Sequence, residues 1–260
     1  MRRLHPGPPT DVDPVEAYAS DPRPAHPGRP WLLVNMIQSL DGGTAVDGLS
    51  GSLGGPADLT VFRAIRAVPD MILVGAATAR QESYQPPNLS DHLAKLRTQR
   101  GQAAAPRLAV MSRSVTFSPD EAWLEPTNDG GRPFLIVPRD APAHRLEALG
   151  DRVDVIEAGI GSVDLTAALE ALGRAGAQVV LSEGGPSVNG QLVADDLVDE
   201  ICLSLSPALV AGDSKRIAHG AEPDLIHRFR LTRALIDDDL LFFRYVRPLS
   251  LPPDGGPPLS

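Results

Sequence analysis

Between residues 31 and 247 the sequence alternates between short apolar runs typical of β-strands and longer runs with the apolar spacing of helices. A strand, a helix and a second strand in succession form a parallel pair, because the helix carries the chain back along the sheet. Apolar runs without polar interruption indicate strands buried on both faces. The sequence therefore predicts an α/β fold with a mixed, mostly parallel central sheet flanked by helices. The predicted strands are WLLVNMIQ (31–38), DMILVG (70–75), RLAVMS (107–112), PFLIVP (133–138), RVDVIEA (152–158), AQVVLSEGG (177–185) and DEICLSLSP (199–207).

The end of this region has a different pattern. RLTRALIDDDLLFFRYV (230–246) contains two strand-like runs separated by the acidic residues 237–239. Two such runs joined directly by a short polar turn indicate an antiparallel hairpin. We therefore expect a C-terminal antiparallel hairpin whose turn is exposed to solvent.

Composition changes at both ends of the chain. Residues 1–30 are rich in proline and polar residues, and residues 248–260 are rich in proline and glycine. Such segments are typically extended and weakly ordered. We predict a Pro-rich N-terminal arm over residues 1–30, one domain over residues 31–247, and a Pro/Gly-rich tail over residues 248–260.

Charge and cysteine content exclude several classes of function. The formal net charge of −9 argues against a nucleic-acid-binding protein, which needs a basic face. The single cysteine, Cys202, rules out an internal disulfide, and the scattered histidines show no metal-ligand spacing, so no metal site is expected. The N-terminus has no apolar stretch of a signal peptide, and no apolar run approaches the roughly 20 residues that span a bilayer. A cytoplasmic location without a membrane partner is expected.

The stretch LSEGGPSVNGQ (181–191) places a carboxylate, two adjacent glycines and a proline where a predicted strand gives way to a helix. In open α/β sheets, ligands bind at the carboxyl ends of strands, and the first N–H groups of a helix attract anions. Residues 184–187 therefore fit a diphosphate cradle, because glycines let a ligand approach the backbone. A tight turn that requires glycine explains them equally well. Glu183 favours the ligand site, since packing alone explains a carboxylate there poorly.

Two further strand ends carry residues that suit phosphate. Thr78 follows the strand 70–75, where its hydroxyl can cap a helix or meet a phosphate. Ser112 and Arg113 follow the strand at 107–112, where a hydroxyl and a guanidinium can bind the 2′-phosphate that distinguishes NADP from NAD. Taken singly, a helix cap and a surface arginine explain these residues better. Three such strand ends together favour a nucleotide site.

Three stretches of the sequence also carry motifs that occur together in one enzyme family. They are NMIQSLDGGTAVDGLSG (35–51), FRAIRAVPDMILVGAATARQE (62–82) and LSEGGPSVNGQLVADDLVDEICLSLSPALVAG (181–212). Together they resemble the reductase domain of bacterial riboflavin biosynthesis. The resemblance implies a dihydrofolate reductase-like fold, a homodimer, and NADPH as the cofactor. The implied reaction is reduction of 5-amino-6-(5-phosphoribosylamino)uracil or a closely related pyrimidine, with hydride transfer to C1′ of the opened ribosyl group.

The same resemblance assigns roles to individual residues. Glu183, Asn35 and Asp41 are the catalytic candidates, although Asp41 suits stabilisation of its turn better than proton transfer. Ser50, Arg66 and Glu183 are expected to contact the substrate, with Arg66 suited to the ribose 5-phosphate. The residues expected to contact the cofactor are Ile37, Ser52, Thr78, Glu82, Ser112, Gly185, Pro186, Ser187, Val188, Asn189, Gly190 and Gln191, to which the strand-end argument adds Arg113 and Gly184.

Two positions depart from the family pattern and leave alternatives open. Many members have a lysine where this chain has Asn35, and a neutral amide cannot replace its charge. Asp58 places an acid near the start of a predicted helix, where dihydrofolate reductases hold the pterin ring with an acid. Complementing the helix dipole is the simpler explanation of Asp58. The alternatives are therefore reduction of dihydrofolate or another pterin, with Asp58 binding it, and a catalytically silent NADP-binding protein.

Overall fold

The computed structural model of the protein describes residues 1–248 except for residues 25, 119, 128–130 and 224. Its strands are β1 (Arg2–His5), β2 (Thr10–Asp11), β3 (Trp31–Gln38), β4 (Met71–Gly75), β5 (Arg107–Met111), β6 (Phe134–Val137), β7 (Asp154–Glu157), β8 (Val179–Ser182), β9 (Glu200–Leu205), β10 (Arg230–Asp237) and β11 (Leu240–Val246). Its helices are α1 (Pro14–Ala19), α2 (Pro56–Arg66), α3 (Ala76–Gln81), α4 (Asp91–Gln99), α5 (Ala143–Leu149), α6 (Leu165–Arg174) and α7 (Pro186–Ala194), with short 3-10 helices η1 (Gly51–Leu53), η2 (Ala122–Leu124) and η3 (Gly150–Arg152).

The strands form one sheet in the order β2-β1-β10-β11-β9-β3-β8-β4-β5-β6-β7. From β9 to β7 all neighbours pair in parallel, whereas β9, β11, β10, β1 and β2 pair antiparallel. The predicted α/β class and the mostly parallel sheet are thus confirmed. The hairpin of β10 and β11 is confirmed too, and its turn residues Asp238 and Asp239 adopt the positive φ angles that two-residue hairpin loops require.

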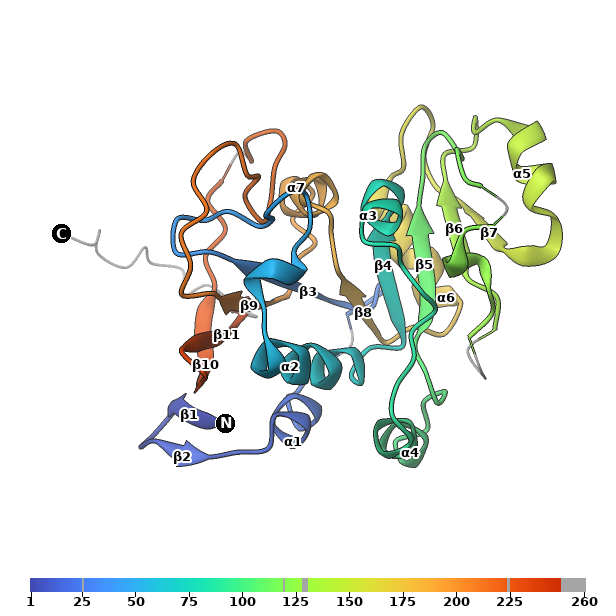
Figure 1. The fold of residues 1–260 in the computed structure, drawn as a ribbon. Coiled ribbons are helices and arrows are strands. Elements are labelled where there is room, and N and C mark those ends of the chain that lie inside the picture. The colour runs from blue at the N-terminus through green and yellow to red at the C-terminus, as the bar shows by residue number, and fades with distance from the viewer. Residues whose placement is uncertain (25, 119, 128–130, 224, 249–260) are drawn as a thin grey trace.

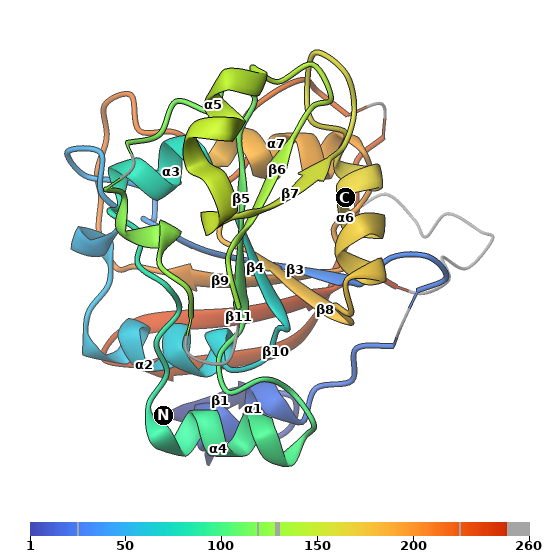
Figure 2. The same cartoon turned by 90° about the vertical axis from the view of Figure 1, so that its right-hand side faces the viewer.

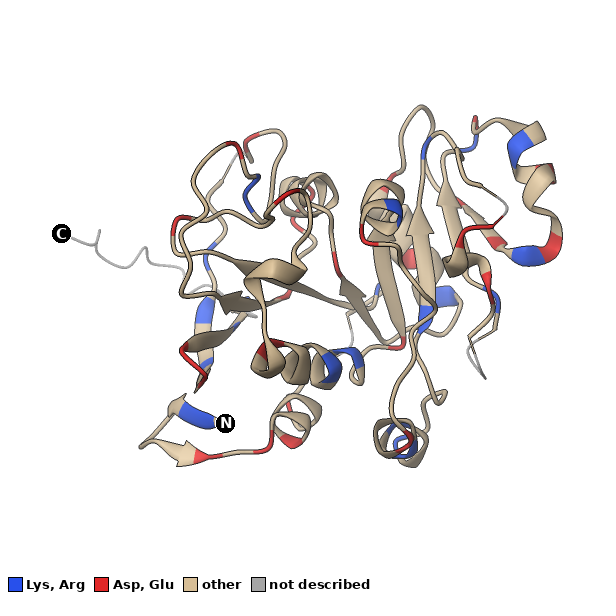
Figure 3. Ribbon diagram, in the orientation of Figure 1, with Lys and Arg blue, Asp and Glu red and all other residues tan. Residues whose placement is uncertain are grey.

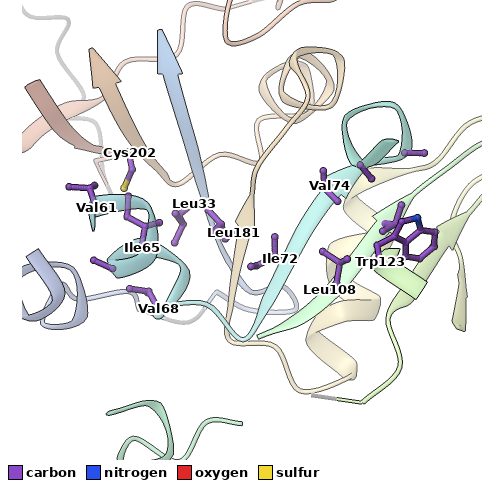
Figure 4. Close-up of a cluster of buried hydrophobic side chains, with 14 of the residues drawn as sticks. Leu33, Val61, Ile65, Val68, Ile72, Val74, Leu108, Trp123, Leu181 and Cys202 are labelled. Carbon is purple, nitrogen blue, oxygen red and sulfur yellow. The ribbon is translucent and has the colours of Figure 1, made fainter. Parts of the chain in front are cut away.

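Helices cover both faces of the sheet (Figures 1 and 2). On one face, Val61 and Ile65 of α2 pack against Leu33, Leu181 and Cys202 of the central strands (Figure 4). The opposite face is covered by buried leucines of α6 and α7. This two-sided burial explains why β4 reads as an uninterrupted apolar run, since all its residues are buried. Because β3, β4, β8 and β9 pair in parallel, their carboxyl ends lie at the same edge of the sheet.

Residues 1–30 do not form the extended arm that their composition predicts. β1 pairs with β10 and adds a strand to the sheet. Asp13 caps α1, and Tyr18 of α1 is buried in the core that α2 also joins. The Arg233 guanidinium lies over the Tyr18 ring at 4.2 Å. These contacts with distant parts of the chain supply the order that the local composition lacks.

The C-terminal tail and helix α4 also differ from the segments described so far. The predicted tail, residues 248–260, lies outside the described residues after Pro248. Helix α4 was not expected; its Arg97 is buried and donates hydrogen bonds to the carbonyls of Ala67 and Pro69, which joins α4 to the α2–β4 connection. Within the described residues, no helix combines the length and the apolar character needed to cross a membrane.

Candidate active site

A cleft of about 1190 Å³ opens at the carboxyl ends of β3, β4 and β9 and beside the residues that follow β8. Its walls come from β3, α2, α3 and the residues that follow it, the start of α7, and the loops after β3 and β9. Ligand pockets commonly measure roughly 300–1,000 Å³, so the cleft has room for two ligands. Of the residues expected from the sequence, those lining it are Asn35, Ile37, Ser50, Asp58, Arg66, Thr78, Glu82, Glu183, Gly185, Pro186, Ser187 and Val188.

The starts of α3 and α7 lie next to each other, and residues of both line the cleft. They lie so close that a Cβ atom on Gly185 would overlap the Oγ1 atom of Thr78. A Cβ on Gly75 would lie 2.9 Å from a methyl group of Val188. The first turn of α7 lines the cleft, and the first N–H groups of a helix have no acceptor within it. Backbone donors and a hydroxyl without intervening side chains fit a diphosphate, so this end suits a dinucleotide cofactor.

The other characteristic group in the cleft is a buried carboxylate, Glu183. Its two oxygens accept hydrogen bonds from Arg66 Nε at 2.7 Å and Arg66 Nη2 at 2.6 Å. The Tyr84 hydroxyl donates a further hydrogen bond to Oε2. The Arg66 guanidinium also lies over the Phe62 ring at 4.2 Å. Glu183 and Arg66, 117 residues apart in sequence, thus form a bidentate pair at the cleft wall.

The protonation states of this cluster follow from its geometry. Burial alone would lower the pKa of Arg66, but the Glu183 carboxylate outweighs burial and raises it. Burial and the Glu183 charge both raise the pKa of Tyr84 well above its usual value. Arg66 is therefore charged and Tyr84 protonated at neutral pH. Because Glu183 neutralises Arg66, the cluster offers fixed hydrogen-bond donors and little net positive charge.

Helix α2 contributes an acidic, an aromatic and a basic side chain to the cleft wall. Asp58, Phe62 and Arg66 are spaced four residues apart and all line it. Figure 3 shows acidic colour at the start of α2 and basic colour at its end. Burial raises the pKa of Asp58, and a hydrogen bond from Ser204 partly offsets this rise.

The loop after β3, which lines the cleft, is hydrogen-bonded to the end of α3. Glu82 accepts hydrogen bonds from both the N–H and the hydroxyl of Ser50, at 3.0 Å each. Gln81 donates a hydrogen bond to the Gly48 carbonyl. Both ties fasten the loop after β3 to the end of α3. Glu82, expected at the cofactor, thus positions Ser50, expected at the substrate.

Asp41 does not line the cleft. Its carboxylate accepts hydrogen bonds from the Ser39 hydroxyl at 2.6 Å and from the N–H groups of Ala211 at 2.7 Å and Val210 at 3.1 Å. These bonds, the Ser39 bond first, lower its pKa to about 2. Asp41 therefore joins the loop after β3 to the loop after β9, and the geometry gives its carboxylate no place at a reacting atom.

Several predicted cofactor residues also lie outside the cleft lining. Ser112 is buried and accepts a hydrogen bond from the Val115 N–H, while Arg113 is exposed at the same strand end. Asn189 donates to the Ile217 carbonyl and accepts from the Ser182 hydroxyl, which is a packing role. The remaining residues outside the lining are Ser52, Gly184, Gly190 and Gln191.

Gly190 has a packing explanation of its own. A Cβ atom there would overlap the carbonyl oxygen of His219 in the loop after β9, and Pro186 accepts a hydrogen bond from the His219 N–H at 2.9 Å. The absence of a side chain at Gly190 therefore lets this loop pack on α7.

We expect Gly190→Ala to lower the free energy of unfolding by about 2 kcal/mol, because the loop backbone must move away from α7. Urea unfolding followed by circular dichroism measures the change. Gly51→Ala is the matched control, since a Cβ at Gly51 meets nothing within 4 Å. Equal midpoints for the two variants would show that the loop does not depend on this contact.

Sequence reasoning missed Tyr84, Phe62 and Lys215, which all line the cleft. Phe62 could have been predicted from the sequence, because the i, i+4 spacing with Arg66 places both side chains on one helix face. Tyr84 and Lys215 lie in loops without periodic pattern. Among the described residues, no group of histidine, cysteine or carboxylate side chains could hold a metal ion.

The family model named RibD C-terminal domain matches residues 30–239. The chain belongs to the RibD C-terminal domain family. This confirms the resemblance drawn from the three motif stretches. It agrees with the oxidoreductase class, and a reductase of this family suggests a nicotinamide cofactor.

Individual relatives agree with this assignment. The 2,5-diamino-6-ribosylamino-4(3H)-pyrimidinone 5′-phosphate reductase of Archaeoglobus fulgidus is 31% identical over 197 residues, which cover 74% of this chain and 87% of the relative. The reductase of the same name from Methanothermobacter thermautotrophicus is 29% identical over 193 residues, with 74% and 85% covered. A solved structure of a pyrimidine reductase-like protein from Corynebacterium diphtheriae matches with a TM-score of 0.79 at 26% identity, covering 90% of this chain and 98% of that one.

Proposed function

We propose that the chain catalyses the NADPH-dependent reduction of a 6-ribosylamino-pyrimidine 5′-phosphate in riboflavin biosynthesis. The deaminated uracil form is the substrate expected from the sequence, and the 2,5-diamino form is the one named for the relatives. The observation that carries the proposal is the cleft itself. It joins an anion cradle at α7 to the Glu183–Arg66–Tyr84 cluster within one space.

NADPH, when bound, supplies the hydride that C1′ of the opened ribosyl group accepts, giving the ribityl chain. The protein holds the two reactants in attack geometry, which is the main task when the cofactor carries the chemistry. Gly185 and the first turn of α7 would hold the diphosphate, with Thr78 beside it. Ser112 and Arg113, one strand away, would hold the 2′-phosphate and so favour NADPH over NADH.

The substrate half of the cleft would be formed by Ser50, Arg66 and Glu183. Arg66 keeps N–H groups that Glu183 does not use, and these can donate to sugar or phosphate oxygens. Glu183 fixes the orientation of this guanidinium. Asn35 can orient the opened sugar by hydrogen bonding, but it cannot carry the charge of the lysine found in many family members.

A steady-state assay of NADPH absorbance tests the proposal with both pyrimidine forms as substrates. We expect turnover of at least one form, and a higher kcat/KM with NADPH than with NADH. Cofactor binding without turnover of either pyrimidine would refute the reductase proposal and favour a silent NADP-binding protein. Equal kcat/KM for the two cofactors would remove the role of Ser112 and Arg113. Sedimentation of the same preparation tests the homodimer that we propose from the family.

A second candidate function is reduction of dihydrofolate or a related pterin. The observation that favours it is Asp58, a carboxylate at the cleft wall whose pKa is raised by burial. A pterin ring presents neighbouring N–H groups that can donate hydrogen bonds to such a carboxylate. Dihydrofolate in the same assay tests this candidate, and no NADPH oxidation above background would exclude it.

A further inference from the structure

Acids outnumber cations in the lining of the cleft, although the proposed ligands carry phosphate groups. The acidic residues of the lining are Asp47, Asp58, Glu82, Glu183 and Asp213. Among the described residues, the cations of the lining are Arg66 and Lys215. Carboxylates repel phosphate groups at short range, so a ligand with phosphates needs a cation close to it. The cleft can meet this need only with a cation whose charge the protein has not already neutralised.

Arg66 does not supply such a free charge. Its guanidinium forms the bidentate pair with Glu183, at 2.7 and 2.6 Å. Lys215, by contrast, takes part in none of the ion pairs among the described residues, not even with Asp213 two positions earlier. A lysine ammonium is a compact charge with three N–H donors, which suits phosphate oxygens. Of these two cations, Lys215 is therefore the one available to an anionic ligand.

Hydrogen bonds fix the backbone of Lys215 beside the loop after β3. The Lys215 carbonyl accepts hydrogen bonds from the Thr44 N–H at 3.1 Å and from the Thr44 hydroxyl at 2.9 Å. The preceding residue, Ser214, donates from its hydroxyl to the Ala45 carbonyl at 3.0 Å. Lys215 itself is exposed. Only its side chain must therefore be ordered when a ligand binds, which limits the entropy cost.

The same loop connects Lys215 to the proposed diphosphate cradle. Four residues further on, the His219 N–H donates a hydrogen bond to the carbonyl of Pro186, the first residue of α7, at 2.9 Å. Four residues of chain span at most about 14 Å. The groups assigned to the cradle are the first N–H groups of α7 and the Thr78 hydroxyl, and all of them are uncharged. A cation from the adjoining loop would balance the charge of a diphosphate held there.

We infer that Lys215 supplies the positive charge that binds the diphosphate of the cofactor. The inference deepens the proposed function and rests on it, because NADPH is the cofactor named there. The first turn of α7 would bind the diphosphate through backbone hydrogen bonds, and the Lys215 ammonium would donate to its oxygens from the loop after β9. Arg66 would then contribute hydrogen bonds to the substrate without adding free charge to the cleft.

Calorimetric titration with NADPH tests this role in the wild type, Lys215→Gln, Lys215→Arg and Lys95→Gln. We expect Lys215→Gln to raise the Kd about 10-fold, the size of effect expected for one lost hydrogen bond to a charged group. Lys215→Arg keeps the charge and should recover most of the affinity. Lys95, the other lysine of the chain, lies exposed on α4, so Lys95→Gln is the matched control and should bind NADPH as the wild type does. A wild-type Kd in Lys215→Gln would refute the inference and leave the proposed function standing.

Titration with NADH separates the diphosphate from the 2′-phosphate of NADPH. Both cofactors carry the diphosphate, so Lys215→Gln should weaken the two by the same factor. A loss confined to NADPH would place the ammonium at the 2′-phosphate and refute the inference. Absence of NADPH binding in the wild type would refute both the inference and the proposed function.

Steady-state kinetics with saturating NADPH separate the cofactor from the 5′-phosphate of the substrate. We expect Lys215→Gln to keep the wild-type kcat and the wild-type KM for the pyrimidine under these conditions. A raised KM for the pyrimidine with an unchanged Kd for NADPH would assign the charge to the substrate and refute the inference. NADPH binding that depends on Lys215 without turnover of either pyrimidine would support the inference and refute the reductase function.

Discussion

Replacing Glu183 by alanine is expected to lower kcat/KM by about 100-fold or more and to destabilise the fold by about 3 kcal/mol. The variant leaves Arg66 in a partly buried position without its bidentate partner, and Tyr84 loses the acceptor of its hydroxyl. The guanidinium then has no fixed orientation in the cleft, where we propose that it contacts the substrate. Steady-state kinetics and urea unfolding measure the two effects separately.

Glu170→Ala is the matched control for this variant. Glu170 lies exposed on α6 and faces Arg174 at 3.8 Å, an exposed pair that contributes at most about 0.5 kcal/mol. We expect wild-type kinetics and stability from it. Wild-type kcat/KM in Glu183→Ala would show that the cluster does not contact or position the substrate.

Glu200→Ala is expected to cause the largest loss of stability, about 3–5 kcal/mol. Glu200 is fully buried in β9 and accepts hydrogen bonds from Arg244, Arg23 and the Trp31 indole. Removing its charge leaves two guanidinium groups buried without their shared acceptor. The free energy of unfolding in urea measures the change, and a loss below about 1 kcal/mol would contradict it.

The contribution of Glu200 should also depend on pH. Burial alone would raise the pKa of Glu200, but Arg23 and Arg244 outweigh burial and lower it. A carboxyl group with a lowered pKa in the folded state stabilises the protein above its ordinary pKa, and this contribution is lost as the pH falls through the lowered value. The stability gap between wild type and Glu200→Ala should therefore be largest at neutral pH and shrink in acid. A gap that stays constant would show that the charge of Glu200 is not what stabilises the fold.

The buried strands of the sheet could be predicted from the sequence, because a strand that is buried on both faces is an apolar run. Strands such as β3 and β4 lie between two layers of helices, so their apolar runs identify them without reference to the rest of the chain. The β10–β11 hairpin could be predicted equally well, because its acidic turn separates two strand-like runs.

The N-terminal segment could not be predicted because its order comes from distant partners. Tyr18 is buried against elements far along the chain, and Arg233 donates hydrogen bonds to Ala17 and Asp21 across more than 200 residues. A proline-rich composition does not show whether a segment has such partners. The arm was therefore inferred from a property that does not distinguish an ordered from an extended segment.

The residues of the site that follow strands could be predicted from the sequence. The ion pair within the site could not. The convergence of Thr78 and Gly185 follows from the parallel arrangement of β4 and β8, which the alternation of elements already implies. The pairing of Arg66 with Glu183, by contrast, depends on how α2 packs across the sheet. The glycines after Glu183 also divide by role, since Gly185 faces Thr78 whereas Gly190 makes room for a loop.

The loop after β9 has a consequence for how the two ligands influence each other. At one end it rests on α7 through Ile217 and His219, and at the other it is held by Asp41 and Thr44 of the loop after β3. If the first turn of α7 holds the cofactor, as we propose, a shift of α7 would reach the loop after β3 through these hydrogen bonds. Such coupling is reciprocal, so each ligand should change the affinity for the other by the same factor. The loop after β9 would then couple the two proposed binding sites through its hydrogen bonds to α7 and to the loop after β3.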